Sequence, residues 1–456
     1  PAARASDVTI SSLLGVNGIW GWQTSRYSSE LAHDKGPKLY SNFAAHGRNY
    51  HNWHWDVADP DTSPPFDDMV SRAETHRGSR PGHSSKLRQD WLNWDHEYAA
   101  WMAAGMEVQV SIQFIADQFP RDTFDDPYTA AYNYGFAFAR HFGPTHGTGN
   151  VHVLEVGNEP WMSGHGYPDP SFYREVLLGM SRGVKEGDPV MRVLPAVFTV
   201  EDTFERMSLE AVEYLDGFNT HAYSWIGTAA GRTGTYPEHP SSCLRESLFI
   251  VKYRDEFFPA MEVYMSELGW DAPGGGQDCD FPECVSEREQ ALYAIRGALL
   301  VARLGFARLS WFFFANLKDD ENGGTKVFSR SGLTSNAEHG FRPKQVLKAL
   351  EVFVSTLGSR RFLNVLQEDR EAYVYVLGDD GGTATHVIAW RPIDGDDTST
   401  TSINIAVSET PAAAFLLGGV EYESVDLPTV SDGVWTMEIS SQPVVVALDA
   451  VAPGCS

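Results

Sequence analysis

Short apolar runs alternate with amphipathic stretches along most of the chain. Eight runs have the length of buried strands: residues 13–19, 49–55, 107–114, 151–156, 191–198, 217–222, 263–266 and 308–314. Helical periodicity is clearest between them at residues 128–142, 172–186, 243–257 and 287–304. Strands that alternate with helices are typical of a parallel sheet, and eight of them in this rhythm predict a (β/α)8 barrel.

The pattern changes near residue 357, where the helical periodicity stops. Six short segments of alternating polarity follow, separated by turns rich in Gly and Asp: residues 372–377, 385–390, 402–407, 413–417, 434–439 and 443–448. Such spacing predicts an antiparallel β-sandwich. We therefore expect a barrel over residues 10–357 and a sandwich over residues 358–456, with residues 1–12 as a candidate addition to the sandwich.

The composition excludes two classes of protein. With 35 basic and 61 acidic residues the net charge is −26, whereas a nucleic-acid partner requires a basic face. No stretch approaches the roughly 18 unbroken apolar residues of a membrane-spanning helix. The hydrophobic share of 42% is enough for a large core. We expect a globular protein whose partner is neither nucleic acid nor a membrane.

The four cysteines bear on where the protein works. Cys279 and Cys284 bracket a short polar loop, which predicts a small disulfide ring in a secreted protein and leaves Cys243 and Cys455 as the other pair. A zinc site is less favoured because suitably spaced His residues are missing. No positively charged, apolar signal segment stands at the start of the sequence, so secretion is an expectation from the cysteines.

Two glutamates stand where predicted barrel strands end. Glu159 lies in Asn158-Glu159-Pro160 after the fourth strand, and Glu267 ends the seventh strand, followed by Leu268-Gly269-Trp270. Catalytic groups of a (β/α)8 barrel gather at the carboxyl ends of its strands. Two carboxyl groups on one rim suit glycoside hydrolysis, in which one protonates the leaving oxygen and the other attacks the anomeric carbon.

These motifs resemble clan A of the glycoside hydrolases, whose members share the barrel and a retaining mechanism. The resemblance implies that Glu159 is the acid/base, that Glu267 is the nucleophile, and that Asn158 binds the sugar 2-hydroxyl. His221-Ala222-Tyr223, which ends the sixth strand, is similar to the clan's His-x-Tyr, in which Tyr contacts the nucleophile and His shapes the sugar pocket. Trp311 on the eighth strand is the counterpart of the clan's floor Trp.

A barrel followed by a sandwich resembles family 39 and its relatives, which include hydrolases of red-algal galactans. For the chemistry, Glu159 must be protonated and Glu267 ionised at the working pH. Apolar neighbours such as Trp161 can raise the pKa of the first carboxyl group. Asn158, Tyr223 or Arg48 can hold the second one charged; we favour Arg48, because clan members often carry an Arg near the nucleophile.

Aromatic and His residues near the strand ends are candidate sugar subsites. Residues with polar neighbours that suit this role are Trp22, His51, Trp53, His54, Trp161 and Trp270. Core packing is the alternative for each of them. We expect no metal at the His residues, because strand alternation would turn His51 and His54 to opposite faces.

Two further segments have plainer alternatives. Residues 319–324 superficially resemble a calcium loop but lack the spacing of an EF-hand, so we favour a solvated loop. A local basic cluster after the second strand could meet sulfate or uronate groups, although we favour the explanation that these are ordinary exposed charges: Arg77, Arg80, Lys86 and Arg88.

We predict a secreted, retaining endo-β-glycosidase that acts without a cofactor or metal on a β-linked polysaccharide. Agarose, porphyran or carrageenan is the leading substrate class, on the family resemblance. A β-xylosidase or another exo-acting β-glycosidase is the alternative among enzymes. A carbohydrate-binding protein without turnover is the alternative of another class, and the presence of both Glu159 and Glu267 argues against it.

Overall fold

The computed structural model describes most of the chain. The described residues are 7–18, 35–66, 94–113, 115, 119–159, 170–197, 209–227, 231–242, 244, 247–317, 327–407 and 409–448. Several predicted features lie outside them: Trp22, Trp161, Cys243, Cys455, the basic cluster at residues 77–88 and the loop at residues 319–324.

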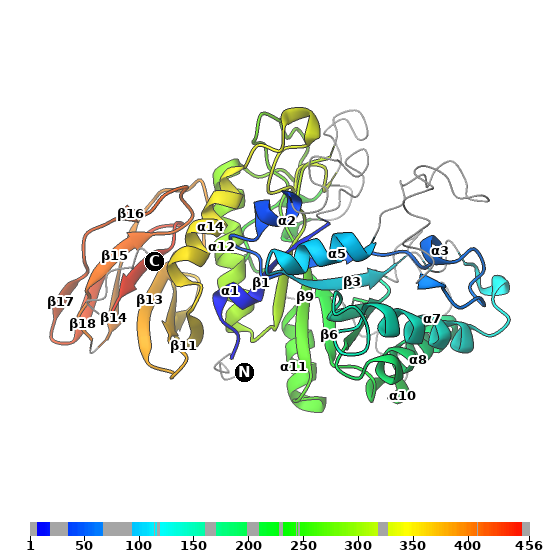
Figure 1. Cartoon of the computed structure of the whole chain (residues 1–456). Helices are drawn as coiled ribbons and strands as arrows, with labels where there is room; N and C mark the ends of the chain where they lie inside the picture. Colours follow the sequence, from blue (N-terminus) through cyan, green and yellow to red (C-terminus); the bar gives the residue numbers. More distant parts are fainter. Residues whose placement is uncertain are drawn as a thin grey trace.

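Eight parallel strands form the predicted barrel (Figure 1). Their bounds are β1 Leu14–Asn17, β2 His46–Tyr50, β3 Glu107–Ile112, β4 Val153–Val156, β5 Arg192–Pro195, β6 Gly217–His221, β9 Glu262–Leu268 and β10 Arg308–Trp311. They pair in the order β5-β4-β3-β2-β1-β10-β9-β6. The two end strands approach each other where the Asp216 amide donates to the Val193 carbonyl at 3.0 Å. The sheet therefore curls into a nearly closed barrel.

Helices cover the outside of this sheet (Figure 1). The longer ones are α5 Trp94–Ala103, α7 Pro127–Phe142, α8 Pro170–Gly187, α11 Ser247–Phe257, α12 Glu287–Arg303 and α14 Gln345–Leu357. The shorter ones are α1 Ile10–Leu13, α2 Lys35–Tyr40, α3 Trp53–Asp56, α10 Leu209–Val212 and the 3₁₀ turns Arg121–Thr123 and Ala337–His339. Local sequence fixes their starts: Ser286 and Glu289 form a capping box on α12, and Asp126 caps α7 ahead of Pro127.

Two antiparallel sheets follow the barrel. The six-stranded sheet pairs β11 Arg361–Glu368, β12 Tyr373–Gly378, β13 Ala384–Trp390, β19 Val444–Ala447, β15 Ala413–Leu416 and β16 Glu423–Ser424. The three-stranded sheet pairs β14 Thr401–Ala406, β18 Val434–Ile439 and β17 Thr429–Ser431. Alternate residues of both sheets, such as Val374, Ile405 and Trp435, form one apolar cluster. This confirms the predicted fold, a (β/α)8 barrel followed by an antiparallel sandwich.

The N-terminal segment touches the six-stranded sheet at one point. Thr9 forms a single antiparallel bridge to Arg361, and α1 begins at the next residue. Thr9 and Ser12 form a capping box that stabilises this helix start. The segment therefore turns into a helix after one bridge instead of adding a full strand.

A buried ion pair joins the barrel to the sandwich. Arg296 on α12 donates from Nε and Nη2 to the carboxylate of Glu238. Its Nη1 donates to the Ile393 carbonyl at 2.8 Å, and Trp390 of β13 donates to Glu238 Oε1 at 2.6 Å. Figure 1 shows α12 and α14 between the barrel and the antiparallel strands. The two parts thus share a buried polar centre.

The second strand differs from its prediction. It begins at His46 and ends at Tyr50, and Trp53–Asp56 form one helical turn, so the strand lies before most of the predicted segment 49–55. The apolar run was misleading because Trp53 is buried against rings of the neighbouring loop and of α7, Phe119, Phe124 and Tyr134. Arg48 of the true strand faces the barrel interior instead, where it meets Glu155 and Glu267.

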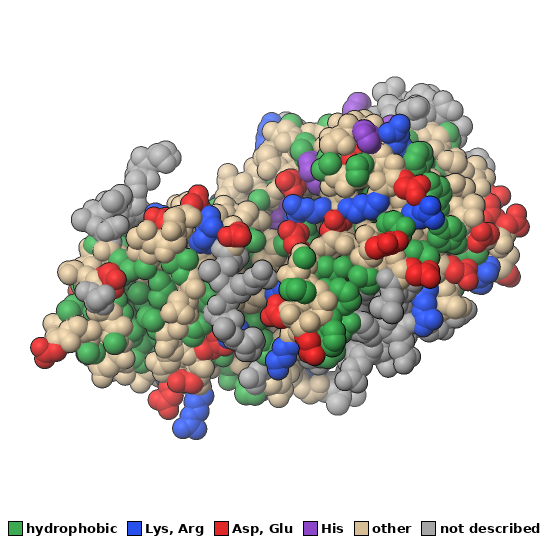
Figure 2. Space-filling model, turned by 90° about the horizontal axis from the view of Figure 1, so that it is seen from below, with side chains coloured by type: hydrophobic (Ala, Val, Ile, Leu, Met, Phe, Trp, Pro, Cys, Tyr) green, Lys and Arg blue, Asp and Glu red, His purple; other side chains and the backbone are tan. Residues whose placement is uncertain are grey.

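Three observations bear on expectations from the composition: they concern membrane helices, surface charge and the cysteines. No helix within the described ranges is long and apolar enough to cross a membrane. Acidic side chains lie at many separate places on the face that Figure 2 shows, with basic ones between them. The predicted disulfide between Cys279 and Cys284 is present.

Candidate active site

The two glutamates meet at the carboxyl ends of the barrel strands. Glu159 lies three residues beyond β4, and Glu267 is the penultimate residue of β9. His221 ends β6 between them: its Nδ1 lies 2.7 Å from Glu159 Oε1 and 3.4 Å from Glu267 Oε2. An oxygen of each carboxylate and one His221 nitrogen all lie within 4.8 Å of one another.

A bulge in β9 turns Glu267 into the barrel. The register against β6 passes from Thr220 opposite Met265 to His221 opposite Glu267, so Ser266 is the extra residue. Side chains of a regular strand alternate between its faces. With the bulge, Ser266 and Glu267 both point inward, and Ser266 Oγ lies 2.9 Å from His221 Nε2.

The carboxylate of Glu267 is surrounded by hydrogen-bond donors. Arg48 Nη1 donates to Oε1 at 2.7 Å, Tyr50 OH donates to Oε1 at 2.5 Å, and Tyr223 OH donates to Oε2 at 2.5 Å. Burial raises the pKa of Tyr50 and Tyr223 well above the usual value, so both phenols stay protonated donors. A buried carboxylate with a guanidinium and two phenols around it is stabilised in its charged form.

Arg48 is held by a second carboxylate below the first. Its Nε and Nη2 donate to the two oxygens of Glu155 on β4, at 2.8 and 2.7 Å. Its Nη2 also donates to Asn158 Oδ1 at 2.9 Å, and Gln109 donates to Glu155. The guanidinium is fully buried, and this bidentate pair fixes the direction in which Nη1 meets Glu267.

Glu159 has a different environment. Its side chain is 14% exposed, against 6% for Glu267, and its contact with the site is the imidazole of His221. If Nδ1 carries the proton, Glu159 accepts it, and the hydroxyl of Ser266 donates to Nε2. One carboxyl group is therefore fixed by a guanidinium, and the other is in contact with a group that can exchange protons.

Aromatic rings form a wall beside Glu267. Tyr223 stacks on Trp225 of β7 (Trp225–Ile226) with ring centroids 5.1 Å apart and planes 10° apart. Phe328 packs on Tyr223 at 4.7 Å, and Phe312 meets it edge-on at 6.1 Å. The guanidinium of Arg232, the residue before β8 (Thr233–Gly234), lies over the ring of Trp225, 3.8 Å from its centroid.

The site residues predicted from the sequence fall into two groups: some lie around the two glutamates, and the others lie in the core or point away. Arg48, Asn158, His221 and Tyr223 lie around the two glutamates, and Asn158 joins the site by accepting a hydrogen bond from Arg48. Tyr50 was missed, and its signal was its place two residues after Arg48, which puts both side chains on one face of β2. Phe312 and Phe328 were also missed, because neither stands in a recognisable motif.

Three predicted subsite residues near β2 lie in the core instead. His51 is fully buried, bonded to Asp56 and Tyr98 and packed against the rings of Trp94, Phe138 and Phe142. Trp53 and His54 are buried as well, on the helical turn after β2. The prediction that His51 and Trp53 contact sugar is therefore wrong in this structure, because the strand ends before them and the chain turns inward.

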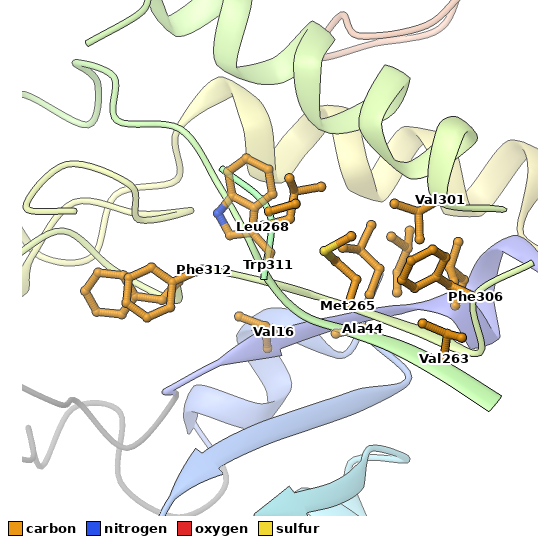
Figure 3. Packing of buried hydrophobic residues seen from close by; sticks show 14 of the residues in the cluster. Val16, Ala44, Val263, Met265, Leu268, Val301, Phe306, Trp311 and Phe312 are labelled. Atoms are coloured by element: carbon orange, nitrogen blue, oxygen red, sulfur yellow. The ribbon is translucent and has the colours of Figure 1, made fainter. Parts of the chain in front are cut away.

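Two tryptophans of the later strands also point away from the carboxylates. Figure 3 shows Trp311 beside Leu268 on the side of the sheet that helices cover, and its Nε1 donates to the Ser331 carbonyl at 3.0 Å. Trp270 packs between Trp311 and Tyr293 of α12. The next residue after Trp311, Phe312, contacts Tyr223, so the predicted register of this strand was wrong by one residue. The peptide bond after Phe312 is cis.

Glu159, His221 and Glu267 offer the one set of donor atoms among the described residues that could hold a metal ion. Nitrogen and carboxylate oxygen are donors that zinc accepts. In the structure, however, His221 hydrogen-bonds to Glu159, and Glu267 pairs with Arg48. The trio therefore suits proton transfer without an ion, and chelation can separate the two uses.

Comparisons with known proteins place the fold. No family model and no curated protein sequence matches the chain. A family 39 glycoside hydrolase from the gut symbiont Bacteroides cellulosilyticus WH2 has a similar structure, with a TM-score of 0.66 and 16% identity, over 97% of this chain and 82% of that one. A family 51 arabinofuranosidase from Xanthomonas axonopodis pv. citri gives a TM-score of 0.62 at 12% identity, over 98% of both chains.

A third solved structure is similar over almost the whole length. A monomeric beta-xylosidase from Caulobacter crescentus CB15 gives a TM-score of 0.58 at 14% identity, over 99% of this chain and 98% of that one. At such identities the likeness concerns the fold. The chain has the (β/α)8-barrel fold of the clan A glycoside hydrolases, as its motifs indicated.

Proposed function

We propose that the protein is a retaining glycosidase with Glu267 as nucleophile and Glu159 as acid/base. The observation that supports this most is the pair of carboxylates with an oxygen of each within 4.8 Å and with contrasting partners. Retaining enzymes hold the two carboxyl groups about 5–5.5 Å apart, whereas inverting enzymes leave about 6.5–9.5 Å for a water molecule. The short separation favours double displacement.

In the first step Glu267 attacks the anomeric carbon, and the bond between that carbon and the leaving oxygen breaks. Glu159 gives its proton to the leaving oxygen, and His221 beside it can share the resulting charge. In the second step the Glu159 carboxylate takes a proton from water, whose oxygen attacks the anomeric carbon and releases Glu267. Hydrogen bonds from Arg48, Tyr50 and Tyr223 stabilise the negative charge that returns to Glu267.

The substrate is a β-linked polysaccharide or oligosaccharide in this proposal. The structural neighbours include a beta-xylosidase and an arabinofuranosidase, and the family resemblance adds red-algal galactans to the candidates. We keep endo-action on a galactan as the leading choice and exo-action on a xyloside as the alternative. We also propose that the protein works outside the cytoplasm, and the Cys279–Cys284 disulfide supports this.

The test is turnover by matched variants. The wild-type protein is assayed for reducing sugar on agarose, porphyran, carrageenan, xylan and mannan and on aryl β-glycosides, with and without a chelator. We expect activity on one class that survives chelation, and a loss of at least about 10³-fold in Glu267→Gln. Glu159→Gln should lose activity on polysaccharide but keep the first step on an aryl glycoside, whose leaving group needs no proton.

Glu238→Gln is a control for replacing a buried, ion-paired glutamate that is not part of the proposed active site; it should lower stability more than turnover. Near-wild-type turnover by Glu267→Gln would contradict the proposal. Binding to a polysaccharide without turnover on any substrate would favour a carbohydrate-binding protein instead. Loss of activity on chelation would point to a metal at the Glu159–His221–Glu267 trio.

A further inference from the structure

A buried aspartate ties the loop after β9 to the turn that carries Phe328. Asp271 lies four residues beyond Glu267 and is 2% exposed. Its Oδ2 accepts from the Phe328 amide at 2.8 Å, and its Oδ1 accepts from the Arg330 amide at 2.7 Å. One carboxylate therefore holds both ends of a single turn over residues 328–330.

This turn needs such a tie because its backbone is strained. Phe328 has φ 72°, in the left-handed region that side chains other than glycine and asparagine rarely adopt. Two further contacts brace the same segment: the Ala272 amide donates to the Arg330 carbonyl, and Lys344 Nζ donates to that carbonyl at 2.8 Å. The surrounding structure imposes the conformation, as is typical of strain near functional sites.

The strained residue packs against the group that touches the proposed nucleophile. The Phe328 ring lies 4.7 Å from Tyr223, 5.6 Å from Trp225 and 5.3 Å from Phe312. Tyr223 in turn donates its hydroxyl to Glu267 Oε2 at 2.5 Å. Contacts therefore run without a gap from Asp271 through Phe328 and Tyr223 to Glu267.

We propose that Asp271 is a positioning residue for Glu267: it holds Phe328 against Tyr223, so that the phenol stays directed at the carboxylate. The inference rests on the proposed role of Glu267. Asp271 itself touches neither carboxylate of the active site among its recorded contacts, so its effect on turnover must pass through Phe328 and Tyr223.

The test is a double-mutant cycle between Asp271→Asn and Tyr223→Phe on the best substrate found. Asn keeps the size of Asp but replaces one accepting oxygen with an amide that faces a backbone N–H. We expect each single variant to lower kcat about tenfold or more with little change in KM, since each weakens a hydrogen bond to a charged group. In the Tyr223→Phe background, Asp271→Asn should cost less than about twofold more.

Asp188→Asn is the matched control. Asp188 is also buried, and it accepts hydrogen bonds from the backbone amides of Thr145 and His146. It lies on the turn before β5, at the opposite end of the barrel. It should lower Tm with kcat unchanged. If Asp271→Asn folds poorly, Phe328→Leu removes the ring contact while the carboxylate stays, and it should show the same lack of additivity with Tyr223→Phe.

Fully additive losses in the cycle, or a lower Tm with unchanged kcat as in the control, would overturn the inference. Failure of the proposed function gives a different result, namely that Glu267→Gln keeps its turnover. The positioning of Tyr223 by Asp271 is judged separately, from the double-mutant cycle. The two failures are therefore distinguishable in one set of variants.

Discussion

The two glutamates of the site are the same chemical group in two environments. Glu267 accepts from Arg48, Tyr50 and Tyr223, whereas Glu159 contacts the imidazole of His221. Donors that point at an ionised oxygen favour the charged form, and a partner that can take or give a proton favours exchange. In the proposed mechanism, these contacts decide which glutamate attacks and which one transfers protons.

Replacing Tyr50 by Phe tests this at the residue scale. The substitution removes one donor from a buried carboxylate, a hydrogen bond worth about 1.5–3 kcal/mol, so we expect kcat/KM to fall about 10- to 100-fold. The fall is checked by comparing kcat/KM of the variant with that of the wild type on the same substrate.

Tyr132→Phe is the control, since Tyr132 also donates to a glutamate, Glu186, but on the exposed face of α7. Its kcat/KM should equal that of the wild type. An unchanged kcat/KM in Tyr50→Phe would show that the phenol does not support the role of Glu267.

Much of the residue scale was predictable. Asn158-Glu159-Pro160, Glu267 and His221-Ala222-Tyr223 stand at strand ends, so the parallel sheet alone brings them to one rim. The prediction that His51 and Trp53 contact sugar was wrong because an apolar run does not show where a strand stops and a helical turn begins. Phe328 reaches the site from a loop between elements, and no periodicity reports such a contact.

At the scale of elements, strand β9 and the loop after it carry both the proposed nucleophile and its support. A bulge at Ser266 directs Glu267 inward, and the next glycine lies against β10: a Cβ on Gly269 would stand 2.2 Å from the Phe312 carbonyl oxygen. Beyond it, Asp271 holds the turn of Phe328. The eight strands were predictable from their rhythm, but the bulge and the one-residue register of β10 depend on tertiary contacts that the pattern does not contain.

The buried carboxyl group of Asp271 gives this element a pH signature. Burial raises its pKa to about 6, above the unfolded value of about 3.9. Between these values the folded protein binds more protons than the unfolded one, so this group lowers the free energy of unfolding as the pH rises from 4 to 6, by about 3 kcal/mol.

Denaturant unfolding of wild type and Asp271→Asn at pH 4 to 7 measures the effect. The difference between the two stabilities should shift by that amount, against the wild type, as the pH rises. A difference that stays constant across this range would contradict the raised pKa.

At the scale of the whole molecule, the barrel and the sandwich are joined through charge. Arg296 and Glu238 are fully buried side chains that pair across α12 and the loop after β8, and Trp390 and Ile393 of the sandwich complete their hydrogen bonds. A buried pair left with one partner costs far more than an exposed one. The two parts therefore should not unfold independently.

Arg296→Met should lower the free energy of unfolding by about 3–5 kcal/mol, because Glu238 stays buried without its cation. Tryptophan fluorescence and far-UV circular dichroism should still report one unfolding transition. Arg182→Met, which breaks an exposed pair with Glu186, should leave the free energy of unfolding nearly unchanged. Two separate transitions in the wild-type protein would contradict the coupling of the two parts.

The order of barrel and sandwich was readable from the sequence, because helical periodicity stops where the antiparallel strands begin. The joint between them was not, since Glu238, Arg296 and Trp390 stand far apart in the chain and show no motif. The net charge of −26 predicts that nucleic acid is not a partner, which stays a prediction, and it says nothing of the sugar. Two of the 61 acidic residues carry the proposed reaction.

The stereochemistry of hydrolysis tests the central claim most directly. Proton NMR can follow the first anomer released from an aryl β-glycoside of the sugar that the protein hydrolyses, before mutarotation mixes the forms. Double displacement through Glu267 predicts that the β-anomer appears first and the α-anomer only later. First release of the α-anomer would mean a single displacement by water and would contradict the account.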